Sequence, residues 1–466
     1  MTTPRSRRKS TRAVLPVPSL RTLAERYAIG KTLREKVPRS RHAGWTPPSR
    51  RRNPIDILIE SSAGRIPSLL PIRYGRMLQS PFAFYRGAAA IMAADLATTP
   101  KTGVRLQVCG DCHLMNFGGF ATPERRIIFD INDFDETLPA PWEWDVKRLS
   151  ASFVAAARSN RFTKREARAA ATAAVRSYRE HVASIAEMPT MQAWYVSVSG
   201  LAEAVGNPRL RKRYDKLVRE ERVHGSAHEF AELAHYVDGA ARIKDDPPLV
   251  FHADIERDPA FWRRVHRELR RYRESLPDDR RVLFDRFQLC DMAAKVVGVG
   301  SVGTACAVAL FLAAKEDPLF LQFKEAHSSV LEPFAGKSVY ANHGERVVIG
   351  QRLMQAASDI FLGWTTGEEA RHFYVRQLRD IKIKPLVEIM EPPDLVSYAQ
   401  ACGWALARAH ARSGDAAVLA GYMGKGGAFD DAIADFAVAY ADQNERDHQE
   451  LVKAVRAGRI KVKTGT

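Results

Sequence analysis

The stretch CGDCHLMNFGGF, residues 109–120, decides how the rest of this sequence is interpreted. Cys109, Cys112 and His113 have the spacing that attaches a c-type haem, and the same Cys-x-x-Cys is also the spacing of a redox pair. Asp111 and Asn116 instead have the spacing of a phosphoryl-transfer loop, in which a carboxylate orients the acceptor hydroxyl and an amide oxygen binds a metal ion. The surrounding sequence has to distinguish these three interpretations.

The haem and redox interpretations lack the features they need. Haem attachment takes place outside the cytoplasm, and an export signal needs an apolar stretch where this chain has Arg12, Pro16, Pro18 and Arg21. A redox pair needs a lowered thiol pKa, and Asp111 between the two thiols would raise it. The chain has five cysteines, too few and too scattered for a disulfide framework. We therefore expect reduced thiols and a cytoplasmic protein.

The charge of the chain is concentrated at its N-terminus. Of a net charge of +17 over 466 residues, residues 1–52 carry +13, from fifteen Lys or Arg against two acids. We expect these residues to form a flexible basic arm, either a solvated tail or a site for nucleic acid or anionic lipid. The longest uncharged apolar run, residues 305–314, is far shorter than the roughly 20 residues of a membrane span.

Carboxylates follow two predicted strands. A strand at residues 104–108 leads into the opening motif, and a strand at residues 125–131 leads into NDFDET, which contains Asp133 and Asp135. Each acid taken singly fits a turn residue at the end of a strand. Together, oxygen ligands at two neighbouring strand ends suit a hard cation such as Mg²⁺.

A β-rich segment follows a long, mostly helical region at residues 145–287. MAAKVVGVGSVGTACAVALFLAA and PLFLQFKEA predict three strands, with a glycine-rich turn between the first two; a helix and a strand at residues 373–378 come later. A GxGxxG turn inside a hairpin favours a kinase-type phosphate loop over a dinucleotide fold. Lys324 in the third strand needs an anionic partner, for which Glu332 and Glu345 are both candidates.

These motifs resemble known sequence signatures. GDCHLMN followed by INDFDE is similar to the GDxHxxN and IDF(D/E) signatures of aminoglycoside phosphotransferase-like kinases. SPFAFYRGAA, CGDCHLMNFGGF, FLQFKEAHSSVLEP, QRLMQAASDIFLGW and YVRQL more closely resemble the bacterial family called domain of unknown function 2252, over residues 55–440.

The resemblance implies ATP and Mg²⁺ as cofactors and gives each motif residue a role. Asp111 would be the catalytic base with His113 beside it, and Asp145 would steady their loop. The implied metal ligands are Asn116, Asp133 and Asp135; the implied nucleotide contacts are Gly298, Gly300, Ser301, Gly303, Lys324, Glu332 and Gln377.

The order of the motifs is inverted relative to kinases. The catalytic loop precedes the glycine-rich hairpin and Lys324, and the helix ending LARAHARSGD resembles the one that normally runs into the catalytic loop. We infer a circular permutation, which predicts that the segments around His410 and Val104 are neighbours in space. Cys109 stands where these kinases usually have a histidine.

The predicted fold is a circularly permuted, kinase-like α+β protein with two lobes. Its expected parts are a basic arm at residues 1–52, a helical lobe at 53–290, a small antiparallel β lobe at 291–380, and C-terminal helices at 381–466. Arg73 and Arg86 fall outside the kinase pattern and either pair with a carboxylate in the helical lobe or reach into the site.

The predicted function is Mg²⁺-dependent transfer of a phosphoryl group from ATP to an unknown, small-molecule acceptor. Two alternatives remain open at this point. One is nucleotidyl (AMP) transfer, and the other is a non-catalytic protein that binds a nucleotide, or binds nucleic acid through the basic arm.

Overall fold

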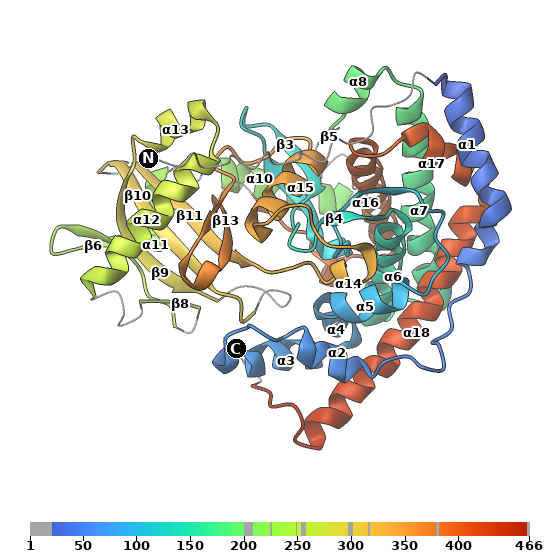
Figure 1. Ribbon diagram of the computed structural model, residues 1–466, viewed down its shortest axis with the longest axis horizontal. Helices are drawn as coiled ribbons and strands as arrows, with labels where there is room; N and C mark the ends of the chain where they lie inside the picture. Colours follow the sequence, from blue (N-terminus) through green and yellow to red (C-terminus); the bar gives the residue numbers. More distant parts are fainter. Residues whose placement is uncertain are drawn as a thin grey trace, which may run out of the picture.

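The computed structural model describes residues 21–199, 208–223, 226–247, 249–252, 258–296, 302–315, 317–378 and 382–463. Over these residues the chain is a mixed α+β protein, as the sequence predicts. Figure 1 shows one large sheet gathered on one side of the molecule and most of the long helices on the other. Among the described residues, no helix has both the length and the apolar character needed to cross a bilayer.

An antiparallel six-stranded sheet forms the smaller lobe, in the order β12-β13-β11-β10-β9-β8. Its strands are β8 (Val250–Phe251), β9 (Gln288–Lys295), β10 (Cys306–Ala314), β11 (Asp317–Ala326), β12 (Gly363–Thr366) and β13 (His372–Gln377). β9, β10 and β11 pair in chain order, and the glycine-rich turn connects the first two. The predicted strands are confirmed, and β8 and β12, which the sequence analysis did not predict, extend the sheet at its edges.

Two helices lie between β11 and the last two strands of the sheet. The chain leaves β11 and passes through the short α14 (Glu332–Ala335) and the longer α15 (His343–Met354) before it returns to the sheet as β12 and β13. The side chain of Asn342 begins α15 by accepting hydrogen bonds from the backbone N–H groups of Gly344 (2.7 Å) and Glu345 (3.1 Å). The antiparallel strands and the predicted helix, here α15, are confirmed, and the single-turn α14 was not predicted.

Both faces of the sheet are covered by elements from residues 226–290. Phe311 and Leu321 pack against one set of helices, whereas Leu310 and Phe320 pack on the opposite face. Side chains alternate between faces along a strand, so two apolar strands need cover on both sides. Residues 226–290 were expected in the helical lobe. The structure instead packs them against the sheet. The covering elements are α11 (Ser226–Leu233), β6 (Ala234–Val237), β7 (Ala240–Ile243), α12 (Pro259–Ser275) and α13 (Asp278–Phe284).

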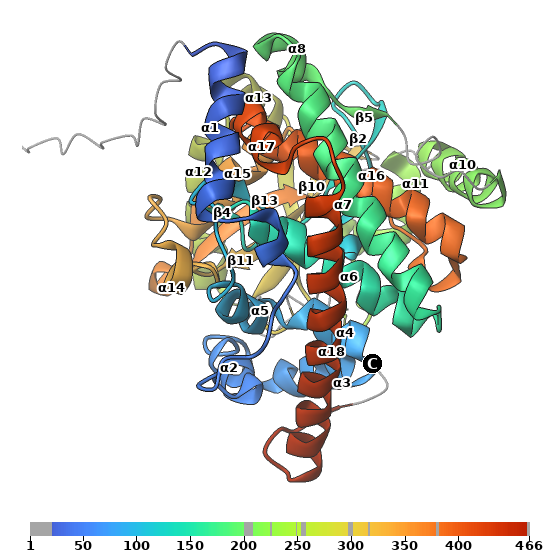
Figure 2. The ribbon, with the colours of Figure 1, turned by 90° about the vertical axis from the view of Figure 1, so that its right-hand side faces the viewer.

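Long helices form the larger lobe around an extensive apolar core. In Figure 2 the long C-terminal helix α18 runs across α6 and α7, which it contacts along much of its length. The helices of this lobe are α6 (Glu143–Ser159), α7 (Lys164–Ala186), α8 (Thr190–Tyr195), α10 (Pro208–Val223), α16 (Pro392–Ala411), α17 (Ala416–Met423) and α18 (Ala428–Arg456).

Two small sheets hold the motif loops between the lobes. The strands predicted before the motifs are confirmed as β1 (Arg105–Val108) and β3 (Ile127–Ile131). β1 pairs with β4 (Leu138–Pro141). β3 lies in a second sheet with the order β14-β2-β3-β5, in which β2 (Phe117–Ala121) was not predicted as a strand. The two remaining strands are β5 (Val198–Ser199) and β14 (Lys382–Ile383).

The part of the basic N-terminal segment that the structure describes is folded. Residues 21–52 form α1 (Leu23–Lys36) and the 3₁₀ turn η1 (Arg39–His42), and α1 packs along α17. Arg51 makes paired hydrogen bonds to Asp95 and Asp447. The concentration of basic residues predicted a flexible arm at residues 1–52. In residues 21–52, basic side chains such as Arg51 and Arg34 instead donate hydrogen bonds to carboxylates or backbone carbonyls.

Four short α-helices and one 3₁₀ helix follow this segment and lead to β1. They lie beneath the gap between the sheet and the long helices in Figure 1. Their bounds are α2 (Pro54–Glu60), η2 (Pro67–Leu69), α3 (Leu70–Leu78), α4 (Pro81–Gly87) and α5 (Ala89–Leu96).

The end of α16 and the strand β1 are neighbours, as the sequence analysis predicted. The backbone N–H of Gln107 donates to the hydroxyl of Ser413 at 3.0 Å. His410, on the last turn of α16, lies 3.2 Å from the carboxylate of Asp145 at the start of α6. Chain segments about three hundred residues apart therefore meet at the base of the first motif.

Candidate functional site

Three carboxylates from the two motifs line one small cavity. Asp111 lies in the loop after β1, and Asp133 and Asp135 lie in the turn between β3 and β4. All three face a cavity of about 50 Å³, to which Glu136 also contributes. The structure therefore brings the acids of the two motifs together.

The carboxylate of Asp111 is oriented by an arginine that the sequence analysis did not single out. Arg148 on α6 donates to Oδ1 of Asp111 through Nε at 2.7 Å and through a second guanidinium nitrogen. Oδ2 of Asp111 lies 3.9 Å from Nε2 of His113. Burial lowers the pKa of His113 to about 3, so that imidazole is neutral. The Asp111 side chain keeps 18% exposure and faces the cavity.

The loop that carries Asp111 is fixed from below by Asp145. The two oxygens of Asp145 accept the backbone N–H groups of Cys109 (2.7 Å) and Gly110 (3.0 Å). His410 reaches the same carboxylate, and the hydroxyl of Tyr178 lies 2.9 Å from its other ring nitrogen. The role expected for Asp145 is thus seen in its contacts. Cys109 stands where the similar kinases usually have a histidine, and it contacts Asp145 only through its backbone N–H. The histidine that contacts Asp145 is His410, from α16.

Gly110 is required by the backbone at this point. Its φ is +84°, and a Cβ atom on it would lie 2.3 Å from the carbonyl oxygen of Glu136. A side chain would therefore both strain the loop and push the two motif loops apart. The glycine lets the Asp111 loop approach the Asp133 turn closely.

The Asp133 turn holds two carboxylates in different electrostatic states. Lys324 forms an ion pair with Oδ2 of Asp135, and the hydroxyl of Tyr374 donates to Oδ1 at 2.8 Å. Burial alone would raise the pKa of Asp135, but Lys324 and these hydrogen bonds lower it to about 2. Burial and the neighbouring charge of Asp135 raise the pKa of Asp133. A divalent cation would relieve the repulsion between the two acids.

Lys324 is a buried cation in the middle of the sheet. It lies on β11 with Cys306 opposite it on β10 and Tyr374 opposite it on β13. Burial would lower its pKa, but the carboxylate of Asp135 outweighs this effect and raises it, so the ammonium group stays charged. Its side chain is only 4% exposed.

The ionic partner of Lys324 is not one of the two predicted glutamates. Its ion pair is with Asp135, whereas Glu332 lines a larger cleft and Glu345 lies half-buried on α15. α15 reaches the turn through a different residue. Buried Arg346 donates to the backbone oxygens of Asp135 and Thr137, both at 2.7 Å.

Asn116 belongs to the Asp111 loop. Its side-chain nitrogen donates to the backbone oxygen of Asp111 at 2.7 Å, so its amide oxygen is the atom left to bind a cation. Asn116 does not itself line the 50 Å³ cavity. Carboxylate and amide oxygens are the ligands that Mg²⁺ prefers, and the donor set of Asp133, Asp135 and Asn116 fits that ion.

The glycine-rich turn is described only at its C-terminal end. Gly298, Gly300 and Ser301 lie outside the described residues, and Gly303 has a φ of +90°. The carbonyl of Gly303 accepts the N–H of Ile66, and the carbonyl of Val302 accepts a hydrogen bond from Arg65, both at 2.7 Å. Arg65 also lines the 50 Å³ cavity, so this one residue contacts both the glycine-rich turn and the cavity of the carboxylates.

Gln377 lies apart from the carboxylates. It faces a second cavity of about 40 Å³ together with Asn132, Asp359 and Arg376. Its backbone N–H donates to Asp359 at 2.6 Å. The structure does not bring Gln377 into the cavity of Asp111 and Asp133.

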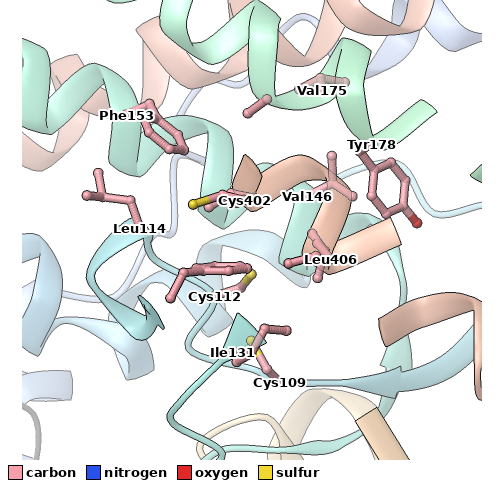
Figure 3. Close-up of a cluster of buried hydrophobic side chains, with 14 of the residues drawn as sticks. Cys109, Cys112, Leu114, Ile131, Val146, Phe153, Val175, Tyr178, Cys402 and Leu406 are labelled. Carbon is pink, nitrogen blue, oxygen red and sulfur yellow. The ribbon is translucent and has the colours of Figure 1, made fainter. Parts of the chain in front are cut away.

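The cysteines of the opening motif face the apolar core. Figure 3 shows Cys109, Cys112 and Cys402 among buried apolar side chains such as Leu406. Burial raises the pKa of all three thiols, that of Cys112 to about 11. The Sγ atoms of Cys109 and Cys112 and an oxygen of Asp145 lie within 4.8 Å of one another, but both Asp145 oxygens already accept backbone N–H groups. Protonated, enclosed thiols suit neither haem attachment nor redox exchange.

Comparison with known sequences identifies the family. The family model described as an uncharacterized protein conserved in bacteria, DUF2252, matches residues 65–454. The chain belongs to the DUF2252 family. No curated protein and no solved structure matches it. The matched region of this DUF2252 protein includes both lobes and every carboxylate of the cavity.

Three arginines complete the walls of the cavity in this DUF2252 protein. Arg65, Arg73 and Arg86, all from the segment before β1, face Asp111 and the Asp133 turn. Arg73 and Arg86 were singled out from the sequence, because they fall outside the kinase pattern beside apolar aromatic residues, but Arg65 was not. The sequence around Arg65 has no pattern that predicts a site residue. Its role becomes visible only in the structure, where it contacts the glycine-rich turn.

A larger cleft adjoins the carboxylate cavity. It has a volume of about 620 Å³ and shares Ser61, Arg65, Asp135, Glu136 and Val330 with the smaller cavity. One wall comes from α2 and α5, and the other from the end of β11 and α14. This volume is typical of pockets that bind small molecules.

Proposed function

We propose that this DUF2252 protein is a Mg²⁺-dependent, ATP-using phosphotransferase for a small-molecule acceptor, with a kinase-like fold in circularly permuted order. Asp111 would act as the base, and Asp133, Asp135 and Asn116 would hold the metal ion. Lys324 and the glycine-rich turn would bind the phosphates of ATP.

The observation that carries this proposal is the ion pair between Lys324 and Asp135, which are 189 positions apart in the sequence. It joins β11, the second strand after the glycine-rich turn, to the turn between β3 and β4. A phosphate-binding lysine and metal-binding carboxylates must lie this close if they are to hold one triphosphate. Two unrelated structural motifs would have no reason to meet here.

The order of elements around Lys324 supports a kinase-like lobe. A glycine-rich hairpin, a third strand with a buried lysine, and then a helix follow one another from β9 to α15. In protein kinases the corresponding lysine is on the third strand and the glycine-rich loop covers the phosphates. The contact between Gln107 and Ser413 supports the permutation, because it places the end of α16 next to the strand that enters the Asp111 loop.

In the proposed reaction, the acceptor oxygen attacks the γ-phosphorus of ATP and its proton passes to Asp111. The bond between the γ-phosphorus and the bridging oxygen breaks, and ADP leaves. Because Arg148 holds Oδ1 of Asp111, Oδ2 is the atom that takes the proton. Bound Mg²⁺ would neutralise charge on the phosphate oxygens, as it does in other phosphotransferases.

Nucleotide binding tests this proposal directly. We expect ATP to raise the melting temperature of the full chain in the presence of Mg²⁺. Lys324→Met and Asp133→Asn should both lose this shift, because one removes a phosphate contact and the other a metal ligand. The matched control is Asp130→Asn, which weakens the buried ion pair with Arg408 outside the cavity and should keep the shift. No Mg²⁺-dependent stabilisation of the wild type would refute the proposal.

Turnover separates catalysis from binding. Asp111→Asn should keep the ATP-induced shift but slow ATP consumption by about 10²- to 10⁴-fold, the usual contribution of a general base. Phosphorus NMR of the products then identifies the bond that breaks. ADP indicates phosphoryl transfer, whereas pyrophosphate would indicate the AMP-transfer alternative. The wild type could bind ATP and yet show no turnover with any compound of a broad acceptor screen. This result would favour the non-catalytic alternative.

A further inference from the structure

The cavity of Asp111 and Asp133 contains more positive charge than ATP chemistry on the motif residues requires. Arg65, Arg73 and Arg86 line it, and none of the three belongs to the motifs that carry the proposed reaction. All come from the helical segment before β1. They are therefore candidates for contacts with a second ligand.

Arg86 is held next to Asp111 by a rigid neighbour. Tyr85, the preceding residue on α4, donates its hydroxyl hydrogen to the backbone oxygen of Arg148 at 2.7 Å, and the Arg148 guanidinium stacks over its ring at 4.7 Å. Arg148 in turn holds Asp111. The position of Arg86 is thus tied to that of the proposed base.

The guanidinium of Arg86 has no hydrogen-bonded partner among the described residues, and its Nε is buried. Burial lowers its pKa even with Glu388 and Asp111 nearby. Arg148 shows the opposite behaviour, because direct hydrogen bonds to Asp111 outweigh its burial and raise its pKa. A desolvated guanidinium without a bonded carboxylate is a site where an oxyanion binds favourably.

Arg65 provides a second cation on the same side of the cavity. Its guanidinium donates to Val302 of the glycine-rich turn, and it faces Asp135 and Glu136. Burial lowers the pKa of Arg65 despite these acids. Arg65 also lines the 620 Å³ cleft, so a ligand in the cleft can reach it and Arg86 together.

We propose that the acceptor is an oxyanion-bearing small molecule, whose phosphate or carboxylate group binds Arg86 and Arg65 beside Asp111 while the rest of the molecule fills the 620 Å³ cleft. This inference rests on the proposed phosphotransferase function, since it names the substrate class of the same site. The anionic group anchors the acceptor so that its hydroxyl lies next to Oδ2 of Asp111.

Inorganic phosphate in the presence of a non-hydrolysable ATP analogue tests this inference. With Mg²⁺ and saturating AMPPCP, the position of the γ-phosphate is filled, so added phosphate has to bind elsewhere. We expect phosphate to raise the melting temperature of this complex further, in a saturable way, at constant ionic strength. Arg86→Gln should weaken the apparent phosphate affinity about tenfold or more, the loss expected for a charge-assisted hydrogen bond.

The matched control is Arg158→Gln, which removes a partly buried arginine of α6 whose partners are Asp442 and Glu445, outside the cavity. It should leave the phosphate response unchanged, which excludes a general effect of phosphate on folding. Arg65→Gln should weaken phosphate binding in the same direction as Arg86→Gln. Repeating the titration with acetate distinguishes a phosphate-specific site from a general oxyanion site, and either response supports the inference.

Two outcomes would overturn the inference while leaving the phosphotransferase proposal in place. Phosphate that binds only without AMPPCP would show that the arginines contact the transferred group. A phosphate response equal in the wild type and Arg86→Gln would show that Arg86 is not a ligand. If AMPPCP itself does not bind, the proposed function fails. In that case phosphate binding is compared between the wild type and Arg86→Gln in the absence of nucleotide, and its loss in the variant decides whether the anion site exists.

Discussion

Two buried ion pairs in this protein have similar chemistry and different surroundings. Arg408 and Asp130 lie 2.5 Å apart and are 0% and 1% exposed. Lys324 and Asp135 are 4% and 28% exposed, and Asp135 faces a cavity. The first pair is enclosed on every side, and the second is open to a ligand on its acidic side.

The comparison shows how the surroundings determine what an ion pair can do. Asp130 also accepts the backbone N–H of Ala356 at 2.9 Å, and Arg408 donates to the backbone oxygen of Met354 at 2.8 Å. These contacts tie α16 to β3 and the end of α15. An enclosed pair can only support the fold, because no ligand can compete for either partner. Asp135 of the Lys324 pair faces a cavity, and under the proposed function the pair would exchange part of its contacts for a phosphate or a metal ion.

The largest expected effect is on stability, at the enclosed pair. Asp130→Ala leaves Arg408 buried without its carboxylate, and we expect it to lower the free energy of unfolding by about 3–5 kcal/mol. Urea unfolding followed by circular dichroism measures the change. The ATP-induced shift in melting temperature, measured below the new transition, should remain. A change under 1 kcal/mol would show that the pair contributes little to the fold.

The open pair should show the reverse pattern. Lys324→Met together with Asp135→Asn removes both charges, and removal of both partners costs far less stability than removal of one. We expect the double variant to unfold at a urea concentration close to that of the wild type, but to lose ATP consumption by about 10²- to 10³-fold, as when one transition-state contact is removed. Normal ATP consumption in this variant would mean that the pair serves the fold alone.

A smaller effect separates two glycines with similar backbone angles. Gly110 and Gly103 have φ values of +84° and +87°, but a Cβ on Gly103 would meet no atom within 4 Å. Gly103→Ala should cost about 1 kcal/mol from backbone strain alone. Gly110→Ala adds a collision with Glu136, and we expect it to cost more and to abolish the ATP-induced shift. Equal unfolding free energies for the two variants would contradict a close approach of the loops.

The last prediction, an effect confined to acidic pH, is a pH dependence from buried histidines. Burial lowers the pKa of His42 and His113 to about 3, below the usual 6.5. Between these values the unfolded chain binds protons that the folded chain does not, so stability is lost as the pH falls from about 6.5 towards 3. Each histidine contributes at most about 1.4 kcal/mol per pH unit. Urea unfolding at pH 7 and pH 5 should show a weaker dependence in His42→Gln, and an identical dependence would contradict a neutral, buried His42.

Much of the site could be predicted from short sequence patterns. Local hydrophobic periodicity predicted the strands that lead into the two motifs, and the hairpin and strand that carry the glycines and Lys324. Such patterns report how a segment folds against its immediate neighbours. The role of Asp145 and the contact of the end of α16 with β1 were instead implied by the resemblance to kinases, and the contacts of both agree with it.

Features that depend on contacts between distant segments could not be predicted in this way. The helices of residues 226–290 cover the sheet because their apolar faces pack against strands far along the chain. Residues 21–52 pack on the helical lobe, where their basic side chains bind groups that are distant in the sequence. The sequence also suggested Glu332 or Glu345 as the partner of Lys324, where the structure has Asp135.

The sequence by itself determined the acids, the lysine and the glycines of the site, because acids at strand ends, a lysine inside an apolar strand and glycines in a tight turn are local properties of the chain. It gave no local signal for Arg148 or Arg65. Only the tertiary structure decided which charges face one another. It paired Asp111 with Arg148 and Asp135 with Lys324, and it left Arg86 beside the cavity without a bonded carboxylate. Coulomb interactions depend on distance and burial, and both are set only when the lobes pack together.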